Sequence, residues 1–507
     1  MLTIKTGCAV ALVSASLFAT SSPALAAPPL SDAEALKALL GRIERLEERN
    51  AQLEQEVRAL RKENPADSRA AKQSERPDQP TATAPQADEE TETPAQETAA
   101  QEASPSLLEK LSGIEVDAAL TTVWQKANGL PHGAKPKDRL NYRADLAVKV
   151  PLETTGNIEH SLFAHVRLGQ GQGINETLGY LGHFNVTNAA AFHASGANAD
   201  DSTFILGEAY YQAAIPMPWG MSDGKAREKL ELTLGKMDIF SFFDQNEVAG
   251  DEATQFLNVV FVHNPLLDAL GEVGADANGF QPGAILSYLN ERNESAPWRV
   301  SLGIFGAGEK SSNYQETADS PLTILQAEKG YTLFGERQGN VRLYGWTRRN
   351  VPRFSDPDRS GRHTGLGISL DQEITEGLRL FARYGKLVRG KLPVDRTLAA
   401  GLEVKGNYWK RPKDALGAGA SWLWASRAYR RAGGEGYLNA TSYDDGNGTP
   451  DFHFTPRDAE RVAELYYRFA VTPNLTLTPD AQWIWRGGAN PHARTVRVFG
   501  VRANISY

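Results

Sequence analysis

The chain ends in the stretch Arg494-Thr495-Val496-Arg497-Val498-Phe499-Gly500-Val501-Arg502-Ala503-Asn504-Ile505-Ser506-Tyr507, in which apolar and polar side chains alternate. One face carries Phe499, Val501, Ala503, Ile505 and Tyr507, and the other carries Gly500, Arg502, Asn504 and Ser506. A period of two residues predicts a β-strand with one apolar and one polar face. A strand in this position leaves an unpaired edge, which a closed barrel would pair. We therefore expect a barrel whose apolar outer face meets lipid and whose polar inner face meets water.

The same alternation recurs from Ile114 onward. It is clear where Leu378, Leu380 and Ala382 oppose Arg379 and Arg383. Segments of about ten residues separated by turns are typical of strands that cross a bilayer at a tilt. The predicted strands are residues 114–124, 140–150, 160–170, 204–215, 229–237, 283–290, 298–305, 321–328, 340–348, 363–371, 378–387, 397–405, 418–426, 461–470, 475–485 and 494–507. The expected fold class is all-β, a 16-stranded antiparallel transmembrane β-barrel with an N-terminal α-helical coiled coil.

The connections between these strands alternate between short and long. If the N-terminus is periplasmic, the periplasmic turns include 151–159 and 472–474, which are short. The expected extracellular connections 171–203, 238–282 and 427–460 are the longest in the chain. Outer-membrane barrels show this pattern, and an even strand number places both termini in the periplasm. We expect the outer membrane of a Gram-negative-type bacterium, because a soluble β-sandwich or propeller explains neither pattern well.

Residues 1–26 are typical of a secretory signal peptide. Lys5 precedes an apolar stretch from Cys8 to Ala19, and Ala24-Leu25-Ala26 precedes the expected cut. An uncleaved anchor is the alternative. Cys8 is the single cysteine, so the mature chain is expected to lack disulfides, thiolate metal sites and cysteine nucleophiles.

Residues 31–63 carry a heptad repeat that predicts a parallel coiled coil in the periplasm. The a positions are Leu36, Ile43, Asn50 and Val57, and the d positions are Leu39, Leu46, Leu53 and Leu60. Branched a residues, leucine at d and one buried asparagine favour a dimer. The stretch Arg42-Ile43-Glu44-Arg45-Leu46-Glu47 instead resembles a trimerisation motif, and we prefer a homotrimer. A lone amphipathic helix is the structural alternative.

Residues 64–104 form a predicted linker that is rich in Pro, Ala, Glu and Thr. From Pro65 to Ser104 the chain contains no Val, Ile, Leu, Met, Phe, Trp or Tyr. Such a segment cannot bury enough apolar area to offset its ordering entropy, which predicts disorder. The predicted barrel then takes up residues 110–507.

Three stretches resemble the carbohydrate-selective outer-membrane porin family of the OprB type. They are Leu234-Gly235-Lys236-Met237-Asp238-Ile239-Phe240-Ser241-Phe242-Phe243-Asp244-Gln245-Asn246-Glu247, Thr472-Pro473-Asn474-Leu475 and Pro479-Asp480-Ala481-Gln482-Trp483-Ile484. The resemblance covers roughly residues 110–507 and implies a sixteen-stranded channel for sugar diffusion. It also implies that the C-terminal aromatic residue, usually Phe and here Tyr507, is read by the barrel-insertion machinery.

Sugar passage needs weak, repeated contacts, because tight binding would stop conduction. The inward faces of the predicted strands supply polar and aromatic side chains that suit such contacts. These candidates are Asn141, Arg143, Asp145, His165, Arg167, Glu208, Tyr210, Arg342, Tyr344, Trp346, Arg379, Arg383, Asp480, Gln482 and Arg502. For any one of them, a solvated wall residue or a structural ion pair is the plainer interpretation.

The connection 238–282 is too long for a simple hairpin. It mixes the aromatics Phe240, Phe242, Phe243, Phe256 and Phe261 with the acids Asp244, Glu247, Asp251 and Glu252. We expect it to fold inward and narrow the pore, with its aromatics packed on the wall and its acids facing the channel. Packing against a neighbouring subunit is the alternative, and the acids lack the spacing of an EF-hand calcium loop.

Two pairs of tryptophans lie two residues apart on predicted strands. Trp483 and Trp485 share a face with the apolar row of their strand, which predicts an aromatic girdle at the membrane interface. Trp422 and Trp424 fit either a girdle or a sugar-contacting surface inside the barrel.

Enzyme, cofactor and nucleic-acid functions find little support in the sequence. It contains no HExxH, GxSxG, Walker A or GxGxxG motif, and its 9 histidines are scattered. We therefore expect no catalytic residues, no metal and no cofactor, with an outer-membrane hydrolase as the enzymatic alternative. The net charge of −8 does not indicate nucleic-acid binding.

The expected function is passive, carbohydrate-selective diffusion of sugars through a water-filled barrel embedded in outer-membrane lipid. A general or anion-preferring porin is the alternative that the inward arginines also suit. An alternative of another class is a tether between outer membrane and cell wall, using the coiled coil and linker. Removal of residues 27–104 would separate this tether from a channel, because a tether loses envelope integrity while sugar flux stays intact.

Overall fold

The computed structural model describes residues 113–192, 202–222, 225–268, 279–306, 320–353, 356–434 and 454–507. The predicted signal peptide, coiled coil and linker lie outside these residues. The heptad positions from Leu36 to Leu60 and the homotrimer therefore stay predictions.

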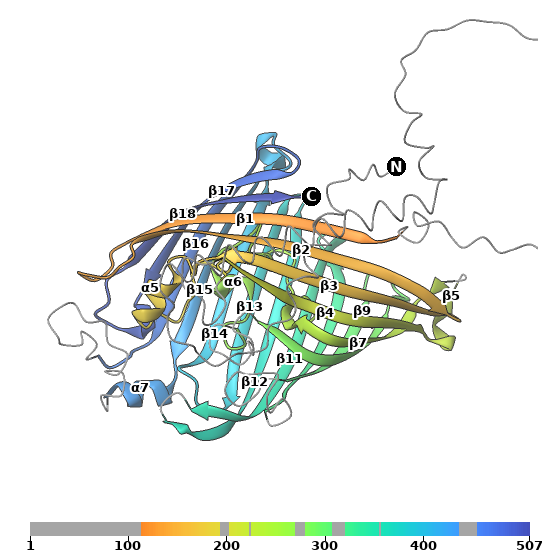
Figure 1. Ribbon diagram of the computed structural model, residues 1–507, viewed down its shortest axis with the longest axis horizontal. Helices are drawn as coiled ribbons and strands as arrows, with labels where there is room; N and C mark the ends of the chain where they lie inside the picture. Colours follow the sequence, from red (N-terminus) through yellow and green to blue (C-terminus); the bar gives the residue numbers. More distant parts are fainter. Residues whose placement is uncertain are drawn as a thin grey trace, which may run out of the picture. The chain divides into compact units, whose positions relative to one another are not determined.

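The described residues form one closed antiparallel barrel of sixteen strands (Figure 1). Each predicted strand overlaps one of them, so the predicted strand number and order are confirmed. The strands are β1 (Glu115–Asn128), β2 (Asp138–Thr155), β3 (Ile158–Gln170), β4 (Thr203–Pro216), β7 (Glu228–Asp238), β8 (Phe280–Asn290), β9 (Trp298–Phe305), β10 (Leu322–Leu333), β11 (Arg337–Arg353), β12 (Asp356–Thr375), β13 (Leu378–Arg389), β14 (Val394–Lys405), β15 (Ala415–Ala425), β16 (Ala459–Ala470), β17 (Leu475–Trp485) and β18 (Val496–Ser506).

Several strands run beyond their predicted ends. The prediction gave residues 363–371 for β12, which in fact spans Asp356–Thr375. Alternation marks only the part of a strand whose outer face is apolar, whereas backbone pairing continues past it. The predicted strand lengths were therefore too short at such places.

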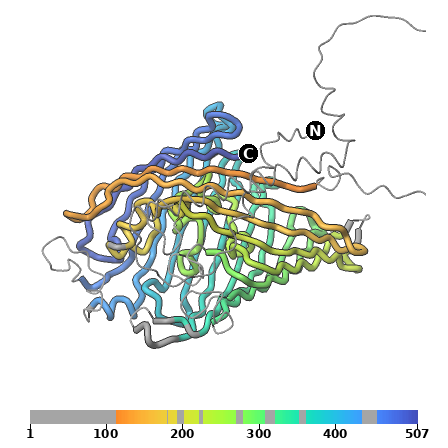
Figure 2. Tube along the Cα trace, viewed as in Figure 1, coloured from red at the N-terminus to blue at the C-terminus, as the bar shows by residue number. Residues whose placement is uncertain are grey.

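The terminal strand closes the barrel as expected. β18 pairs antiparallel with β1, with Val501 opposite Trp124 and Ile505 opposite Leu120. In Figure 2 this seam is the place where the blue C-terminal strand runs beside the orange N-terminal strand. The Tyr507 amide also donates to the Ala118 carbonyl at 2.8 Å, which extends the pairing past β18.

The two faces of β18 differ in exposure as their chemistry predicts. Phe499, Val501 and Ile505 on the outer face are 45%, 42% and 49% exposed. Arg502 and Asn504 on the inner face are 1% and 4% exposed. The outer row suits contact with lipid, whereas the inner row is covered by other parts of the protein.

Short elements connect the wall strands. The helices are α5 (Asn175–Tyr180), α6 (Val259–Val262) and α7 (Arg427–Gly434), with 3₁₀ turns η1 (Pro218–Gly220), η2 (Ile239–Ser241), η3 (Gly406–Trp409) and η5 (Gly487–Ala489). A two-stranded sheet joins β5 (Met221–Ser222) to β6 (Lys225–Ala226). Among the described residues, no helix is long and apolar enough to cross a membrane.

Glycines in the wall let inward aromatic rings lie flat against it. A Cβ on Gly367 of β12 would stand 2.1 Å from the ring of Tyr344 on β11. A Cβ on Gly365 would stand 2.0 Å from the ring of Trp346. Because no larger residue fits there, the two rings lie flat on the backbone of β12. The space inside the barrel is then free for the folded connection between β7 and β8.

Candidate functional site

The connection between β7 and β8 folds into the barrel, and its described part, residues 239–268, is called the inner loop below. It begins with η2, where the Asp238 carboxylate accepts from the Phe240 amide at 2.8 Å. It later forms α6, where the Asn258 side chain accepts from the Val260 amide at 3.2 Å. These caps satisfy backbone donors that would otherwise be buried without partners. The predicted inward fold of this connection is therefore observed.

A buried ion pair fixes the inner loop to β13. The Arg383 guanidinium lies 3.1 Å from the Asp244 carboxylate and donates to the carbonyls of Asp244 and Ala249 at 2.8 and 2.6 Å. It also donates to the Phe261 carbonyl. Asp244 accepts further from the Tyr344 hydroxyl and the Asn264 amide, each at 2.7 Å. One arginine of the wall therefore holds three separate parts of the loop.

A second set of contacts fixes the opposite part of the loop. The Glu464 carboxylate on β16 accepts from the amides of Leu257 and Asn258 at 2.6 and 2.9 Å. The Arg502 guanidinium on β18 donates to the carbonyls of Glu252 and Gln255, each at 2.7 Å. Two wall side chains, Glu464 and Arg502, thus bond the loop backbone directly.

A further connection, between β3 and β4, joins the inner loop. The Glu460 carboxylate on β16 accepts from the amides of Phe184 and Asn185, each at 2.8 Å. The Ala189 amide then donates to the Leu257 carbonyl at 2.8 Å. The two connections therefore brace each other inside the barrel.

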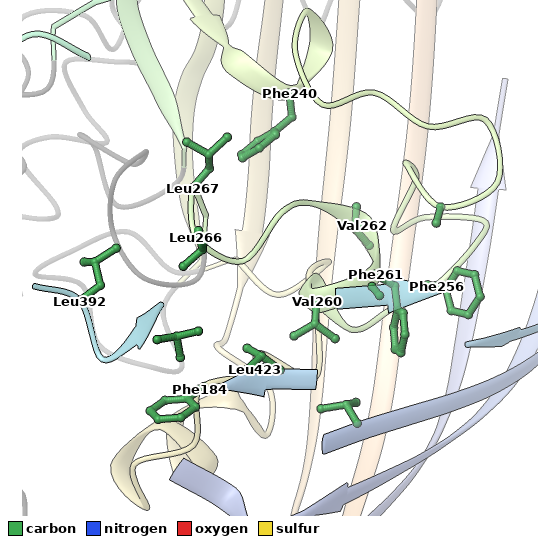
Figure 3. Close-up of a cluster of buried hydrophobic side chains, with 14 of the residues drawn as sticks. Phe184, Phe240, Phe256, Val260, Phe261, Val262, Leu266, Leu267, Leu392 and Leu423 are labelled. Carbon is green, nitrogen blue, oxygen red and sulfur yellow. The ribbon is translucent and has the colours of Figure 1, made fainter. Parts of the chain in front are cut away.

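Apolar side chains of the inner loop pack on the wall. Phe256 lies 5.2 Å from Phe381 and 5.0 Å from Tyr466, measured between ring centroids. Figure 3 shows Phe256 beside Phe261, with Val260 near Leu423 of β15. The expected packing of loop aromatics on the wall is therefore observed.

The structure divides the predicted pore-lining residues by exposure. Arg143, Glu208, Asp244, Arg342, Trp346, Arg383, Asp480, Gln482 and Arg502 are buried. Asp145, Arg167, Tyr210, Asp251, Glu252 and Arg379 are half-buried, and Glu247 is exposed. A role in solute contact stays a prediction for all of these residues.

Two side chains that were expected to be open to the channel are covered instead. Asp244 was expected to face the channel, but it is 1% exposed because Arg383, Tyr344 and Asn264 surround its carboxylate. Trp346 was expected to line the pore, but it is 2% exposed because it lies against Gly365.

Both tryptophan pairs lie on the outer face of the barrel. Ser421 and Leu423 are the buried, inward residues of β15, so Trp422 and Trp424 lie on its outer face. Trp485 on β17 is 38% exposed on the outer face, beside the buried inward Ile484. The sugar-contacting alternative for Trp422 and Trp424 is therefore wrong.

Charged residues of β2 and β3 form an ion-pair group with the inner loop. Arg143 lies 2.7 Å from Asp145 and 2.8 Å from Glu252, and Arg167 lies 2.6 Å from Asp145. His165 adds a contact of 2.9 Å to Asp145. Each arginine here is neutralised by a carboxylate at short range.

A cavity of about 300 Å³ lies beside this group. Phe163, Asp145, His165 and Glu208 are among its lining residues. The ring of Phe163 stacks on Tyr210 with centroids 4.8 Å apart. The cavity therefore combines an aromatic surface with carboxylate acceptors. Phe163 was absent from the predicted pore-lining set, although it shares the inward face of β3 with His165 and Arg167.

A larger cavity of about 540 Å³ lies between the inner loop and strands β8 to β13. Its lining includes Glu247 of the loop and Arg299 and Glu328 of the wall. Arg299 lies 3.2 Å from Glu231, and Glu328 lies 3.0 Å from Arg342. This cavity is polar and nearly balanced in charge. Among the described residues, no group of three or more His, Cys, Asp or Glu side chains is placed to hold a metal ion.

His263 is a titratable residue of the inner loop that contacts a carboxylate. Its ring stacks on Phe240 at 3.8 Å, and its Nδ1 lies 2.7 Å from the Asp268 carboxylate. Burial alone would lower the pKa of His263, but the bond to Asp268 and the charges of Asp268, Asp238 and Glu252 raise this pKa. The charged imidazolium is therefore favoured in the folded loop.

Comparisons with known proteins give consistent results. The model of the carbohydrate-selective porin, OprB family, matches residues 135–507. Porin AaxA of Chlamydia pneumoniae is 28% identical over 248 residues, which cover 45% of this chain and 50% of that protein. Porin AaxA of Chlamydia trachomatis serovar D is 23% identical over 284 residues, covering 55% and 52%. The chain thus spans about half the length of these curated relatives.

A solved structure shares the fold. The high-pH structure of Pseudomonas putida OprB aligns with a TM-score of 0.60 at 18% identity. The alignment covers 79% of this chain and 95% of that chain. At this identity the likeness supports the barrel architecture alone.

Replacement of Arg383 by methionine should destabilise the protein by about 3–5 kcal/mol, because it leaves the Asp244 carboxylate buried without its cation. Thermal or denaturant unfolding in detergent measures the loss. Arg379→Met is the matched control, since Arg379 lies on the same face of β13 without contacting the loop carboxylate. A double variant with Asp244→Asn should lose less than Arg383→Met alone. Equal losses in Arg383→Met and Arg379→Met would contradict the anchoring role.

Loop stability should also fall as pH rises. Because the folded-state pKa of His263 is raised, its stabilising contribution is complete below the ordinary histidine pKa of about 6.5. The contribution is lost as the pH rises through the raised pKa. His263→Gln should therefore remove this part of the pH dependence of unfolding, whereas exposed His492→Gln should leave it. An unchanged profile in His263→Gln would show that the contact with Asp268 does not stabilise the loop.

Proposed function

This chain belongs to the carbohydrate-selective porin family, OprB type, and on that basis we propose that it is a channel for passive, selective diffusion of sugars. Its family and its barrel fold support an outer-membrane porin, and porins are channels. Selectivity for sugars goes beyond the family membership and rests on the interior of the barrel.

The observation that carries the proposal is the cavity beside β1 to β4. There the Phe163–Tyr210 ring stack adjoins the carboxylates of Asp145 and Glu208. A sugar presents apolar C–H groups on its faces and hydroxyls around its edge, so it matches an aromatic surface bordered by hydrogen-bond acceptors. Such contacts are modest in strength and allow release, which conduction requires.

The balance of charge favours uncharged solutes over anions. Inward Arg143, Arg167 and Arg342 each lie within 3.0 Å of a carboxylate oxygen. Arg379 stands opposite Glu373 and Glu403 on the neighbouring strands. An anion-preferring pore would need unbalanced positive charge to attract its solute. The inward arginines therefore give little support to the anion-preferring alternative.

Assembly remains part of the proposal. The predicted coiled coil would hold three copies together on the periplasmic side, and Tyr507 would serve as the signal for the barrel-insertion machinery. Light scattering of the detergent-solubilised chain, with and without residues 27–104, would show whether trimers depend on that segment. No described contact favours the cell-wall tether.

The proposal is tested by single-channel recording in planar bilayers with glucose, maltose and phosphate. Sugars should reduce the ion current of the intact protein as they occupy the pore, and phosphate should do so less. Phe163→Leu should weaken the sugar effect several-fold, because a stacking surface is lost. Phe499→Leu, on the lipid-facing side of β18, is the matched control.

Deletion of residues 244–256 should raise the conductance in the same recordings, because it removes the part of the inner loop held by Arg383 and Arg502. Unchanged conductance after this deletion would contradict the constriction. Equal sugar effects in Phe163→Leu and the intact protein would contradict the sugar contact at this cavity.

A further inference from the structure

Basic and tryptophan side chains gather on the outer face of the barrel at the end away from Glu115 and Tyr507. They lie on β13 to β18, and we call them the rim patch. The rim patch consists of Lys386, Arg396, Trp422, Trp424, Arg461, Trp483, Trp485 and Arg497. None of these side chains points into the barrel, since the buried residues beside them occupy the inward positions.

Strand register brings two of the cations directly together. Lys386 on β13 stands opposite Arg396 on β14. Directly opposite residues on a sheet face have Cβ atoms about 5 Å apart, and like charges there are destabilising. Both residues are exposed. A pairing that disfavours the folded barrel in water becomes favourable when an anion bridges the two cations.

The same register places tryptophans beside the cations. Arg396 also stands opposite Trp424, with its guanidinium carbon 5.4 Å from the ring centroid. Arg461 stands between Trp422 and Trp485. Arg497 stands opposite Trp483. Four neighbouring ladders, from β14–β15 to β17–β18, therefore each combine a cation with an indole ring.

Carboxylates only partly balance this charge. Asp395 lies 3.3 Å from Arg396. Asp458 is shared by Arg461 at 2.5 Å and Arg486 at 2.9 Å. Within the described part of the chain, no ion pair joins Lys386 or Arg497 to a carboxylate. The rim patch is therefore net positive on the side of the barrel that faces lipid.

We propose that the rim patch binds the phosphate groups of a phosphorylated glycolipid in the membrane leaflet at this end of the barrel. The placement of that leaflet rests on the proposed outer-membrane orientation, with the chain termini in the periplasm. Arginine and lysine bond phosphate oxygens, and indole rings settle at the boundary between headgroups and acyl chains. A soluble anion would not need the apolar row below the patch, where Leu398, Ala400 and Ala463 face outward.

The experiment titrates lipid onto the full-length, detergent-solubilised porin and counts bound lipid by native mass spectrometry. The probes are bisphosphorylated lipid A, dephosphorylated lipid A and inorganic phosphate. The intact protein should bind the bisphosphorylated lipid at least tenfold more tightly than the dephosphorylated one. The combined variant Lys386→Gln, Arg396→Gln and Arg497→Gln should lose roughly a hundredfold in affinity, because each basic residue near an anionic lipid contributes severalfold.

A matched control carries the same number of neutralised cations at the other end of the barrel. Lys329, Lys410 and Lys413 are exposed there, and their replacement by glutamine should leave the affinity unchanged. If the combined variant folds poorly, the single variant Arg497→Gln should still lose roughly fivefold.

Two results would overturn the proposal. One is equal affinity of the combined variant and the control variant for bisphosphorylated lipid A. The other is binding of inorganic phosphate as tight as that of the lipid and equally dependent on the patch, which would mark a site for soluble anions. Sugar conductance is not measured here, so failure of this proposal would leave the proposed channel function standing.

Discussion

The structure depends on a constraint that acts inside the barrel, where charged wall residues are buried together with backbone groups of the inner loop. Arg383 is 2% exposed and Arg502 is 1% exposed, yet both carry a positive charge. Burying an unpaired charge costs several kcal/mol, so such residues need partners. Here the partners are the Asp244 carboxylate and the carbonyls of Glu252 and Gln255. The wall side chains and the loop backbone therefore satisfy each other's buried charges and polar groups.

Packing reinforces this mutual dependence. The flat rings of Tyr344 and Trp346 cover glycines of β12, and Phe256 and Phe261 of the loop pack on wall aromatics. The interior thus contains a hydrophobic cluster (Figure 3) together with cavities of about 300 and 540 Å³. In the proposed channel, this packed inner loop would narrow the path and the solute contacts would lie beside it. We therefore expect conductance and stability to depend on the same residues.

The wall could be predicted from sequence because each strand repeats one local rule. A period of two residues identified β13 through Leu380 and Arg379, and it oriented β18 through Val501 and Arg502. Closure between β1 and β18 followed from the unpaired edge of the last strand. The predicted strand ends were less accurate, as at β12, because backbone pairing continues beyond the apolar row.

The interior could be predicted only in part, because its contacts join residues far apart in the chain. Arg502 was assigned to the inner face, but its bond to the Glu252 carbonyl spans 250 positions. Alternation shows that a side chain points inward. It cannot show whether that side chain contacts water or a folded loop. For this reason Asp244 and Trp346 were expected to face the channel and are instead buried. Phe163 could have been recognised, since it lies on the same inward face as Arg167.

The central claim is that the inner loop is a fixed part of the barrel interior. Hydrogen–deuterium exchange of the intact porin tests this most directly, because backbone amides of Leu257, Asn258 and Asn264 donate to buried carboxylates. Peptides that cover these amides should exchange as slowly as those from strand β16. Exchange as fast as in the exposed turn at residues 472–474 would contradict the account.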